Sequence, residues 1–380
     1  MSDSTVSVYK LKGGMVGMGM IFDETYRPFF ENAFRDGVYD ARTGVIKLEI
    51  AAVASRTGGR AAKYKESAGQ SINDFSSYIE PDSIGQLLTH DVDFVCVATP
   101  DDRHFDATMA AIQAGKHVIV EKPSVLSMHE LDAITAAAEE KQVLCKVVYH
   151  KLFDPDHKKL RTFVTDGVLN HINTGYCTLL EPKQISGAQF SEWIQGRNPG
   201  TYVAVHYIKL IDFTFGGTLK SITCSGQRGI VGKADGNTWD STQLRMVYEY
   251  ASGREATFDI HTSWVTPDNF PGYVEQEVQF RFDNGIWNGH SRKRGVECTV
   301  EEQTPITIKN SMNNHYNGTF VEPNGSRSQR GYGIEVLEEF AREVAYVEHG
   351  LDDLTRQQRI AQLSNGYYND ITSDRQTVAT

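Results

Sequence analysis

Short runs of apolar residues recur along the first 150 positions of the chain, and longer stretches with helical spacing separate them. Such runs leave no polar face, which is typical of the strands of a parallel sheet that helices cover on both sides. The runs lie at residues 15–16, 48–53, 93–98, 118–120 and 143–148. This alternation of strands and helices predicts a doubly wound α/β domain over residues 1–150.

The pattern changes after residue 150. Polar and apolar residues alternate in the segments 244–250 and 277–282, which is typical of an antiparallel sheet with one covered face. Ser252-Gly253 follows the first segment, and Asp283-Asn284-Gly285 follows the second. These residues favour tight turns, so we expect hairpins at both places.

Two helical stretches are expected near the end of the chain, at about 333–348 and 355–370. The whole pattern predicts a second α/β domain over residues 151–380, with a large, mostly antiparallel, open-faced sheet. We expect this domain to bind substrate and to mediate oligomerisation. Its C-terminal helices can pack back on the first domain.

The charge and composition exclude several classes of protein. Lys and Arg number 38 and Asp and Glu number 49, which gives a net charge of −11 and no basic block for nucleic acid. The five cysteines show no CxxC spacing, and their number is odd. Because the N-terminus lacks an apolar leader and no long apolar run follows, we expect a cytoplasmic protein without a membrane span.

A glycine-rich turn follows the first predicted strand, in the order Gly17-Met-Gly19-Met20-Ile21-Phe22. It begins like the dinucleotide fingerprint G-x-G-x-x-G/A, in which backbone approaches a pyrophosphate at a helix N-terminus. Phe22 departs from that pattern, since the third position usually holds a small residue. Gly17, Gly19, Met20 and Ile21 are therefore candidate contacts of NADP or NAD in a Rossmann domain, and the alternative is a simple glycine turn.

The end of the second strand bears on the choice of cofactor. An acidic residue there usually binds the ribose 2′-hydroxyl of NAD, but this chain has Ser55-Arg56. A hydroxyl and a guanidinium suit the 2′-phosphate of NADP, so we favour NADP slightly. The alternative is a solvated loop.

Three segments together resemble the Gfo/Idh/MocA family of oxidoreductases, which includes the glucose–fructose oxidoreductase and inositol dehydrogenase types. They are Gly17-Met-Gly19, the pair Thr99-Pro100-x-x-x-His104 and Ala114-Gly115-Lys-His-Val-x-x-Glu121-Lys122-Pro123, and Gly200-Thr-Tyr202-x-x-x-His206. The resemblance reaches about residue 215. It implies NAD(P)-linked oxidation or reduction of a CH–OH group or ketone on a sugar, polyol (inositol-like) or glycoside, in a homodimer or homotetramer.

The resemblance also implies roles for individual residues. Lys122 would be the catalytic lysine, since an amine at a strand end beside a nicotinamide can stabilise a developing alkoxide. Glu121 would lie near the nicotinamide ribose, and Pro123 would shape the turn that presents the lysine. The residues expected to line the cofactor are Thr99, Pro100 and His104. The alternative for Lys122 is a surface lysine after a strand.

His206 is the second catalytic candidate, because an imidazole passes protons in either direction near neutral pH. Family members with an inositol-dehydrogenase-like site carry Asp-x-x-x-His on one helix face, whereas this chain has Tyr202 in place of the aspartate. Tyr202 either joins the proton relay or marks a different mode of substrate binding. The alternatives are a packed helix histidine for His206 and core packing for Tyr202.

Further polar and aromatic residues are candidates to bind the substrate. They are His150 and Lys151, which follow the last strand of the first domain, and Trp193 and Asn198, which precede the predicted helix. A loop with one buried tryptophan would show the same pattern. The remaining histidines lack metal-ligand spacing, so we predict no metal.

Two other functions fit the same fold. One is a nucleotide-retaining glycosidase or lyase that works by transient oxidation of its substrate. The other is a non-catalytic, NAD(P)-binding sensor, which would be expected to lose the lysine and histidine that this chain retains at positions 122 and 206.

Overall fold

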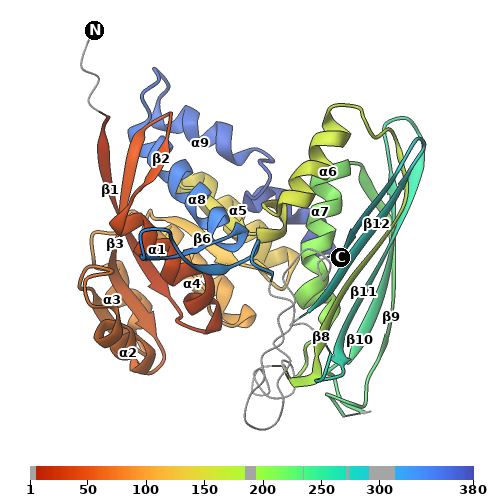
Figure 1. Ribbon diagram of the computed structural model, residues 1–380, viewed down its shortest axis with the longest axis horizontal. Helices are drawn as coiled ribbons and strands as arrows, with labels where there is room; N and C mark the ends of the chain where they lie inside the picture. Colours follow the sequence, from red (N-terminus) through yellow and green to blue (C-terminus); the bar gives the residue numbers. More distant parts are fainter. Residues whose placement is uncertain (1–5, 185–193, 234, 271–273, 291–312) are drawn as a thin grey trace. The chain divides into compact units, whose positions relative to one another are not determined.

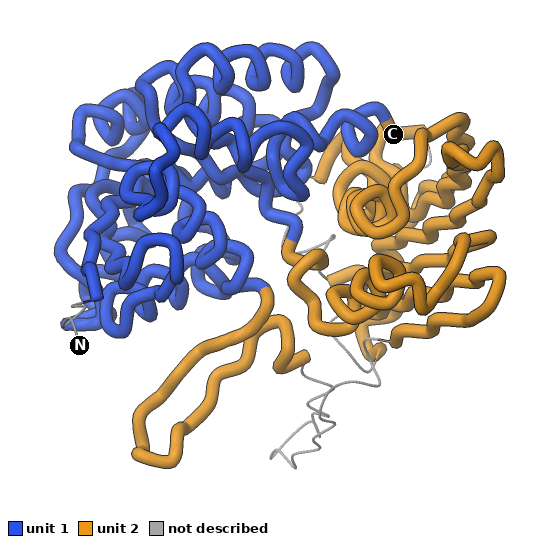
Figure 2. The backbone as a smooth tube through the Cα atoms, turned by 90° about the horizontal axis from the view of Figure 1, so that it is seen from above, with its two compact units in different colours: residues 1–149, 333–379 blue, residues 150–332, 380 orange. Residues whose placement is uncertain are grey.

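The computed structural model describes residues 6–184, 194–233, 235–270, 274–290 and 313–380. The chain divides into two compact units, which Figure 2 shows in different colours. The first unit comprises residues 1–149 and 333–379, and the second comprises residues 150–332 and 380. The C-terminal helices are therefore part of the first unit.

The first unit contains a sheet of seven described strands in the order β2-β3-β1-β5-β6-β7, with β4 paired to β3 (Figure 1). Its strand pairs are parallel except for β2 with β3. The strands are β1 (Val8–Val16), β2 (Val38–Asp40), β3 (Gly44–Ser55), β4 (Ser76–Ile79), β5 (Phe94–Val97), β6 (His117–Glu121) and β7 (Cys145–Val148). This arrangement confirms the predicted doubly wound domain.

Helices cover both faces of this sheet. Gly13 and Gly14 of β1 point to opposite faces, and a Cβ on each would meet Phe30 of α1 and Leu87 of α3, respectively. The strands β5 and β6 are buried along their whole length, which explains their continuous apolar runs. The first helices of the unit are α1 (Arg27–Arg35), α2 (Gly59–Ala68), α3 (Ser83–Leu88), α4 (His104–Gln113) and α5 (Met128–Lys141).

The C-terminal part of the first unit contains α8 (Tyr332–His349), whose first residue belongs to the second unit. It also contains α9 (Arg356–Ser364), the 3₁₀ turn η7 (Ile371–Asp374) and α10 (Arg375–Ala379). The helix expected at 355–370 is thus shorter than predicted, because Gly366 has φ +74° and breaks the helical path. The chain then runs beside β7, where the N–H of Val147 donates to the carbonyl of Asn369 at 2.8 Å.

The second unit contains a six-stranded sheet in the order β13-β12-β8-β11-β10-β9. Its described pairs are antiparallel except for β8 with β11. The strands are β8 (Ile172–Pro182), β9 (Thr218–Gln227), β10 (Ser241–Glu249), β11 (Glu255–Thr266), β12 (Glu275–Phe282) and β13 (Ile286–His290). The hairpins at 252–253 and 283–285 and the mostly antiparallel sheet are confirmed. A separate pair, β14 (Gly318–Val321) and β15 (Arg327–Arg330), also belongs to this unit.

One face of this sheet is covered by helices of its own unit. Buried and exposed side chains alternate along β10 and β11, as the sequence pattern predicts. The covering segments are the short turn η3 (His150–Leu152), α6 (Pro155–Thr165), the π-helical turn η5 (Gly200–Ala204) and α7 (Val205–Phe215). Phe215, the last residue of α7, packs its ring against those of Phe258 and Phe280 in the sheet. None of the described helices has the length and apolar character needed to cross a membrane.

Candidate functional site

The glycine turn after β1 is held between two neighbouring strands. The N–H of Gly17 donates to the carbonyl of Ala54 at 2.9 Å, and the N–H of Ala98 donates to the carbonyl of Val16 at 2.9 Å. Gly17 has φ +91°, and a Cβ there would lie 2.4 Å from the carbonyl oxygen of Ala98. Only glycine fits this position without displacing the backbone.

Gly19 has a different role from Gly17. A Cβ on Gly19 would meet no heavy atom of the described chain within 4 Å, so the space in front of this backbone is open. The helical segment begins at Met20, so its N-terminal turn lies next to the glycine turn. An open backbone at a helix N-terminus fits the pyrophosphate of a dinucleotide.

The departure at Phe22 has a packing explanation. Its ring is buried and meets the ring of Tyr64 of α2 edge-on, with centroids 5.2 Å apart. The turn that starts here, η1 (Phe22–Tyr26), is π-helical. Phe22 thus fills the contact between the first two helices, where the fingerprint usually has a small residue.

The residues after β3 include one that the sequence interpretation missed. The hydroxyl of Ser55 accepts a hydrogen bond from the N–H of Gly58 at 3.1 Å, and Arg56 is exposed. Arg60, at the start of α2, donates to the carbonyl of Gly19 at 3.2 Å and pairs with Asp23. Arg60 therefore brings a guanidinium group to the glycine turn. The sequence around Arg60, Gly59-Arg60-Ala61-Ala62 at the start of α2, contains no motif that would have indicated this role.

Thr99 lies in the turn after β5, and His104 is the first residue of α4. The His104 ring is buried, and its Nδ1 and Nε2 lie 2.7 and 2.9 Å from the carbonyl oxygens of Pro123 and Thr99, respectively. Burial lowers the pKa of His104, although both carbonyls oppose the shift. His104 thus holds two strand-end turns together. The Thr99 hydroxyl is buried and has no hydrogen-bond partner among the described residues, whereas Pro100 is exposed.

Glu121, the last residue of β6, is buried and receives a hydrogen bond of 3.1 Å from the hydroxyl of Tyr26. Burial raises the pKa of Glu121 to about 7, while Lys122 and Tyr26 oppose the rise. Tyr26 was not among the candidate residues, because a tyrosine 95 positions away in η1 gives no local signal.

Lys122 follows Glu121 directly and is half-buried, and the peptide between Lys122 and Pro123 is cis. The strand registers bring this position to the same edge as the glycine turn. Val16 pairs with both Ala54 and Val97, and Val97 pairs with Val120. Because these neighbouring strands are parallel and in step, their carboxyl ends meet at one edge of the sheet.

The second unit brings two candidate histidines together. The ring centroids of His150, in η3, and His206, in α7, lie 4.3 Å apart. Two tyrosines complete this cluster: the ring of Tyr316 lies 5.1 Å from that of His150, and the ring of Tyr332 lies 6.1 Å from it. We call these four residues the His–Tyr cluster. The tyrosines were missed, since nothing in the local sequence connects them to His206.

Tyr202 contacts a different group from His206. It lies in the π-helical turn, and its ring centroid is 6.2 Å from that of Trp264 in β11. Asn198 caps the start of this turn, because its side-chain oxygen accepts the N–H of Thr201 at 2.8 Å. Trp193 lies outside the described residues.

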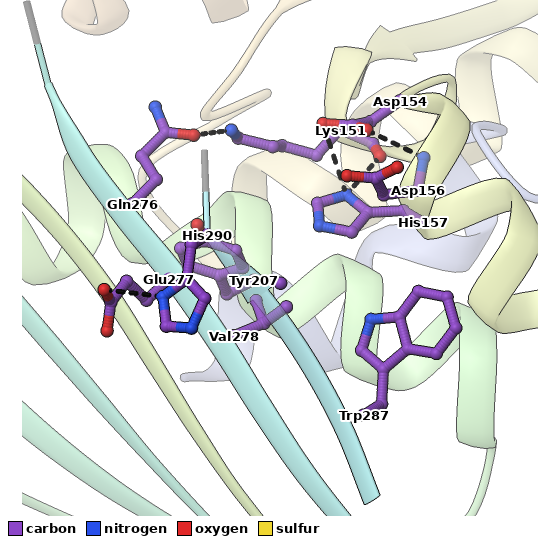
Figure 3. Close-up of a pocket in the computed structure, with 11 residues that line it drawn as sticks. Lys151, Asp154, Asp156, His157, Tyr207, Gln276, Glu277, Val278, Trp287 and His290 are labelled. Carbon is purple, nitrogen blue, oxygen red and sulfur yellow. Dashed lines mark hydrogen bonds and ion pairs between the residues drawn. The ribbon is translucent and has the colours of Figure 1, made fainter. Parts of the chain in front are cut away.

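Lys151 lines a pocket of the second unit, together with residues of α6, α7, β12 and β13 (Figure 3). Its ammonium group donates to the side-chain oxygen of Gln276, and it lies 5.8 Å from the ring centroid of Tyr207. His157 also lines the pocket and is buried, with Nδ1 2.9 Å from the carbonyl oxygen of Lys151. His157 therefore does not lie on the solvent-exposed face of α6.

Comparison with known families gives a match over residues 11–149, to the GFO_IDH_MocA oxidoreductase family with an NAD-binding Rossmann fold. Among curated proteins, scyllo-inositol 2-dehydrogenase (NADP(+)) IolW of Bacillus subtilis is 39% identical over 89 residues, which are 23% of this chain and 25% of that protein. Inositol 2-dehydrogenase of Rhizobium meliloti is 25% identical over 228 residues, which are 60% of this chain and 62% of that protein. The chain thus spans less than two thirds of the length of these relatives.

Solved structures show the same fold over most of the chain. An inositol dehydrogenase homolog from Azotobacter vinelandii, complexed with NADH and myo-inositol, aligns with a TM-score of 0.68 at 18% identity, over 97% of this chain and 93% of that one. A putative myo-inositol dehydrogenase from Sinorhizobium meliloti aligns with a TM-score of 0.62 over 97% of both chains, also at 18% identity. Residues 11–149 thus match the Gfo/Idh/MocA oxidoreductase family, which has an NAD-binding Rossmann fold.

Proposed function

We propose that this protein is an NAD(P)-dependent oxidoreductase that transfers a hydride between the nicotinamide and a CH–OH group or ketone of a sugar, polyol or glycoside. One observation carries the proposal. The glycine turn, Thr99 and Lys122 follow the ends of parallel strands that are in register at one edge of the sheet. In open α/β sheets, this edge is where nucleotides and substrates bind.

The residues of this edge fit a dinucleotide. The backbone of Gly17 and Gly19 would hold the pyrophosphate, and Ser55 and Arg56 would face the adenosine ribose. NADP is slightly favoured, because two guanidinium groups are available for its 2′-phosphate. Arg56 directly follows β3, and Arg60 donates to the glycine turn. When bound, the nicotinamide supplies the chemistry of hydride transfer.

Lys122 and His206 are proposed to handle the substrate oxygen. Oxidation of a CH–OH group removes a hydride from carbon and a proton from oxygen. The Lys122 ammonium group would stabilise the alkoxide that develops, and His206 would accept the proton. His150 is proposed to orient the His206 ring, because the two rings are in contact. Tyr202 is left with a structural role beside Trp264, or with contact to a substrate hydroxyl.

The substrate class is inferred from the family and from the chemistry of the side chains. The two inositol dehydrogenases align with 23% and 60% of this chain, so they support a polyol or sugar without specifying it. The imidazole and phenol groups of the His–Tyr cluster can exchange hydrogen bonds with several hydroxyls. A homodimer or homotetramer is proposed from the open face of the second sheet, and light scattering after gel filtration would measure it.

The test is a dehydrogenase screen of inositols, sugars and glycosides with NAD and NADP, read as the change in reduced-cofactor absorbance together with product analysis. The proposal expects stoichiometric reduced cofactor and ketone with at least one polyol or sugar. Cleaved product without net cofactor reduction would instead identify a nucleotide-retaining glycosidase or lyase. Cofactor binding without turnover of any compound, while a partner protein binds, would favour the sensor.

A further inference from the structure

A carboxylate near the C-terminus joins two strand-end turns of the first unit. Asp374, the last residue of η7, is fully buried. One of its oxygens accepts a hydrogen bond from the hydroxyl of Ser124, and the other accepts one from the hydroxyl of Tyr149 at 2.6 Å. Both donors are themselves buried, so water does not compete for these bonds.

The two donors stand next to candidate functional residues. Ser124 follows the Lys122-Pro123 peptide, and Tyr149 immediately precedes His150. The strands before these turns are paired, since Glu121 of β6 lies opposite Val148 of β7. Asp374 therefore fixes, with one side chain, the turn that carries Lys122 and the turn that leads to His150.

The segment that carries Asp374 is itself held in place. Asp370 caps η7, because its Oδ1 accepts two hydrogen bonds from Thr372. The N–H of Thr372 donates at 3.0 Å and its hydroxyl donates at 2.6 Å. The residue before it, Asn369, accepts the N–H of Val147 of β7. The η7 turn and α10 also pack against α5. The carboxylate is thus attached to the sheet independently of the turns that it joins.

We propose that Asp374 is a positioning residue, which holds the Lys122 turn through Ser124 and the start of the His150 segment through Tyr149. This inference rests on the proposed function, in which Lys122 acts on the substrate oxygen. An ionised carboxylate accepts both hydroxyl hydrogens at once. An amide in its place would present one N–H₂ group, so one of the two hydroxyls would lose its acceptor.

The first measurement does not depend on activity. Hydrogen–deuterium exchange would be followed in the wild type, Ser124→Ala, Asp374→Asn and the matched control Ser127→Ala. Ser127 lies three residues after Ser124, and its hydroxyl caps α5 by accepting the N–H of Glu130 at 3.2 Å. We expect faster exchange of the 122–126 amides in Ser124→Ala, of both the 122–126 and 149–152 amides in Asp374→Asn, and only of the first turn of α5 in Ser127→Ala.

The second measurement uses turnover. We expect kcat to fall about 10- to 100-fold in Ser124→Ala and in Asp374→Asn, with cofactor Kd within about twofold of the wild type, because a misplaced catalytic group affects the reaction more than binding. The double variant should be no slower than Asp374→Asn alone. Ser127→Ala should keep its kcat even though its Tm falls.

The outcomes separate this inference from the proposed function. Unchanged kcat in an active Ser124→Ala enzyme, or unchanged exchange at 122–126, would overturn the positioning role. A fall in Tm without a change in kcat per folded molecule would also overturn it, since that is the result of a purely structural contact. The expected exchange pattern in a protein that turns over no substrate would support the positioning of the turns and reject the oxidoreductase.

Discussion

The imidazole rings of His150 and His206 lie in contact, with centroids 4.3 Å apart and planes tilted by 51°. The two residues come from η3 and α7 of the same unit. Sequence reasoning proposed each of them separately, as a substrate contact and as a proton carrier. Their contact is the basis of the proposal that His150 orients the ring of His206.

This contact predicts unequal effects of two substitutions. His206→Gln should lower kcat/KM about 10²- to 10⁴-fold, because it removes the proposed general base. His150→Gln should lower it about tenfold, since the base would remain but lose its neighbour. Steady-state kinetics would measure both. His261→Gln is the control, because His261 also contacts an aromatic ring of this unit, that of Tyr176 at 5.2 Å, and should leave the rate unchanged. Equal effects at positions 150 and 261 would reject the positioning role of His150.

The two glycines of the turn after β1 should respond differently to alanine. Gly17→Ala should destabilise the fold by roughly 1–3 kcal/mol or more, because the position has φ +91° and its Cβ would meet the carbonyl of Ala98. Gly19→Ala should keep a Tm close to that of the wild type, since its Cβ has open space, yet should weaken NAD(P) binding. Calorimetric titration with NAD(P) and thermal unfolding would test the pair. Undiminished cofactor affinity in Gly19→Ala would contradict the pyrophosphate assignment.

The preference for NADP depends on arginine side chains. Arg56→Ala should lower kcat/KM for NADP about 10- to 100-fold and change that for NAD little, because only NADP carries the 2′-phosphate. Arg60→Ala should have a smaller effect of the same sign. Arg35→Ala is the control, since Arg35 is also exposed and pairs with Asp36 at the far end of α1. A wild-type enzyme that prefers NAD would refute the NADP assignment.

Glu121 predicts a specific dependence of stability on pH. Burial raises its pKa to about 7, so the folded state binds the proton more tightly than the unfolded state does. The neutral side chain favours the fold fully below the unfolded pKa of about 4.3, and this contribution is lost as the pH rises to about 7. Relative to Glu121→Gln, the wild type should therefore lose unfolding free energy between these pH values and show no further loss above them. Urea unfolding at several pH values would measure the difference, and a constant difference would show an ordinary pKa.

Tyr26 modifies this titration. Its hydroxyl donates to the Glu121 carboxylate and opposes the rise of the pKa. Tyr26→Phe should move the titration of Glu121 to higher pH, which infrared difference spectroscopy of the carboxyl stretch can follow. A shift to lower pH would contradict the assigned role of this hydrogen bond.

The fold was predictable from the sequence because its signals are local. Continuous apolar runs identified the buried parallel strands, and alternation with turn residues identified the antiparallel sheet. The end of the helix predicted at 355–370 was wrong. The helical spacing of apolar residues continues past Gly366, but the backbone there has φ +74°.

The candidate site was predictable only where a motif carries its chemistry in consecutive residues, as in Glu121-Lys122-Pro123. Tyr26 with Glu121 and Ser124 with Asp374 are separated by 95 and 250 positions, and no local pattern connects such partners. The sequence showed that Phe22 departs from the dinucleotide fingerprint but not why, because its partner Tyr64 belongs to another helix, α2. Long-range pairs of this kind depend on the tertiary fold.

The central claim is that Lys122 acts in a hydride transfer to or from NAD(P). The most direct test measures kcat and the cofactor Kd of Lys122→Ala on a polyol or sugar found by screening. The control is Lys116→Ala, because Lys116 lies just before β6 and Lys122 just after it. We predict that Lys122→Ala loses kcat by about 10²-fold or more with a cofactor Kd close to that of the wild type, while Lys116→Ala keeps both. Full activity of Lys122→Ala would contradict the account.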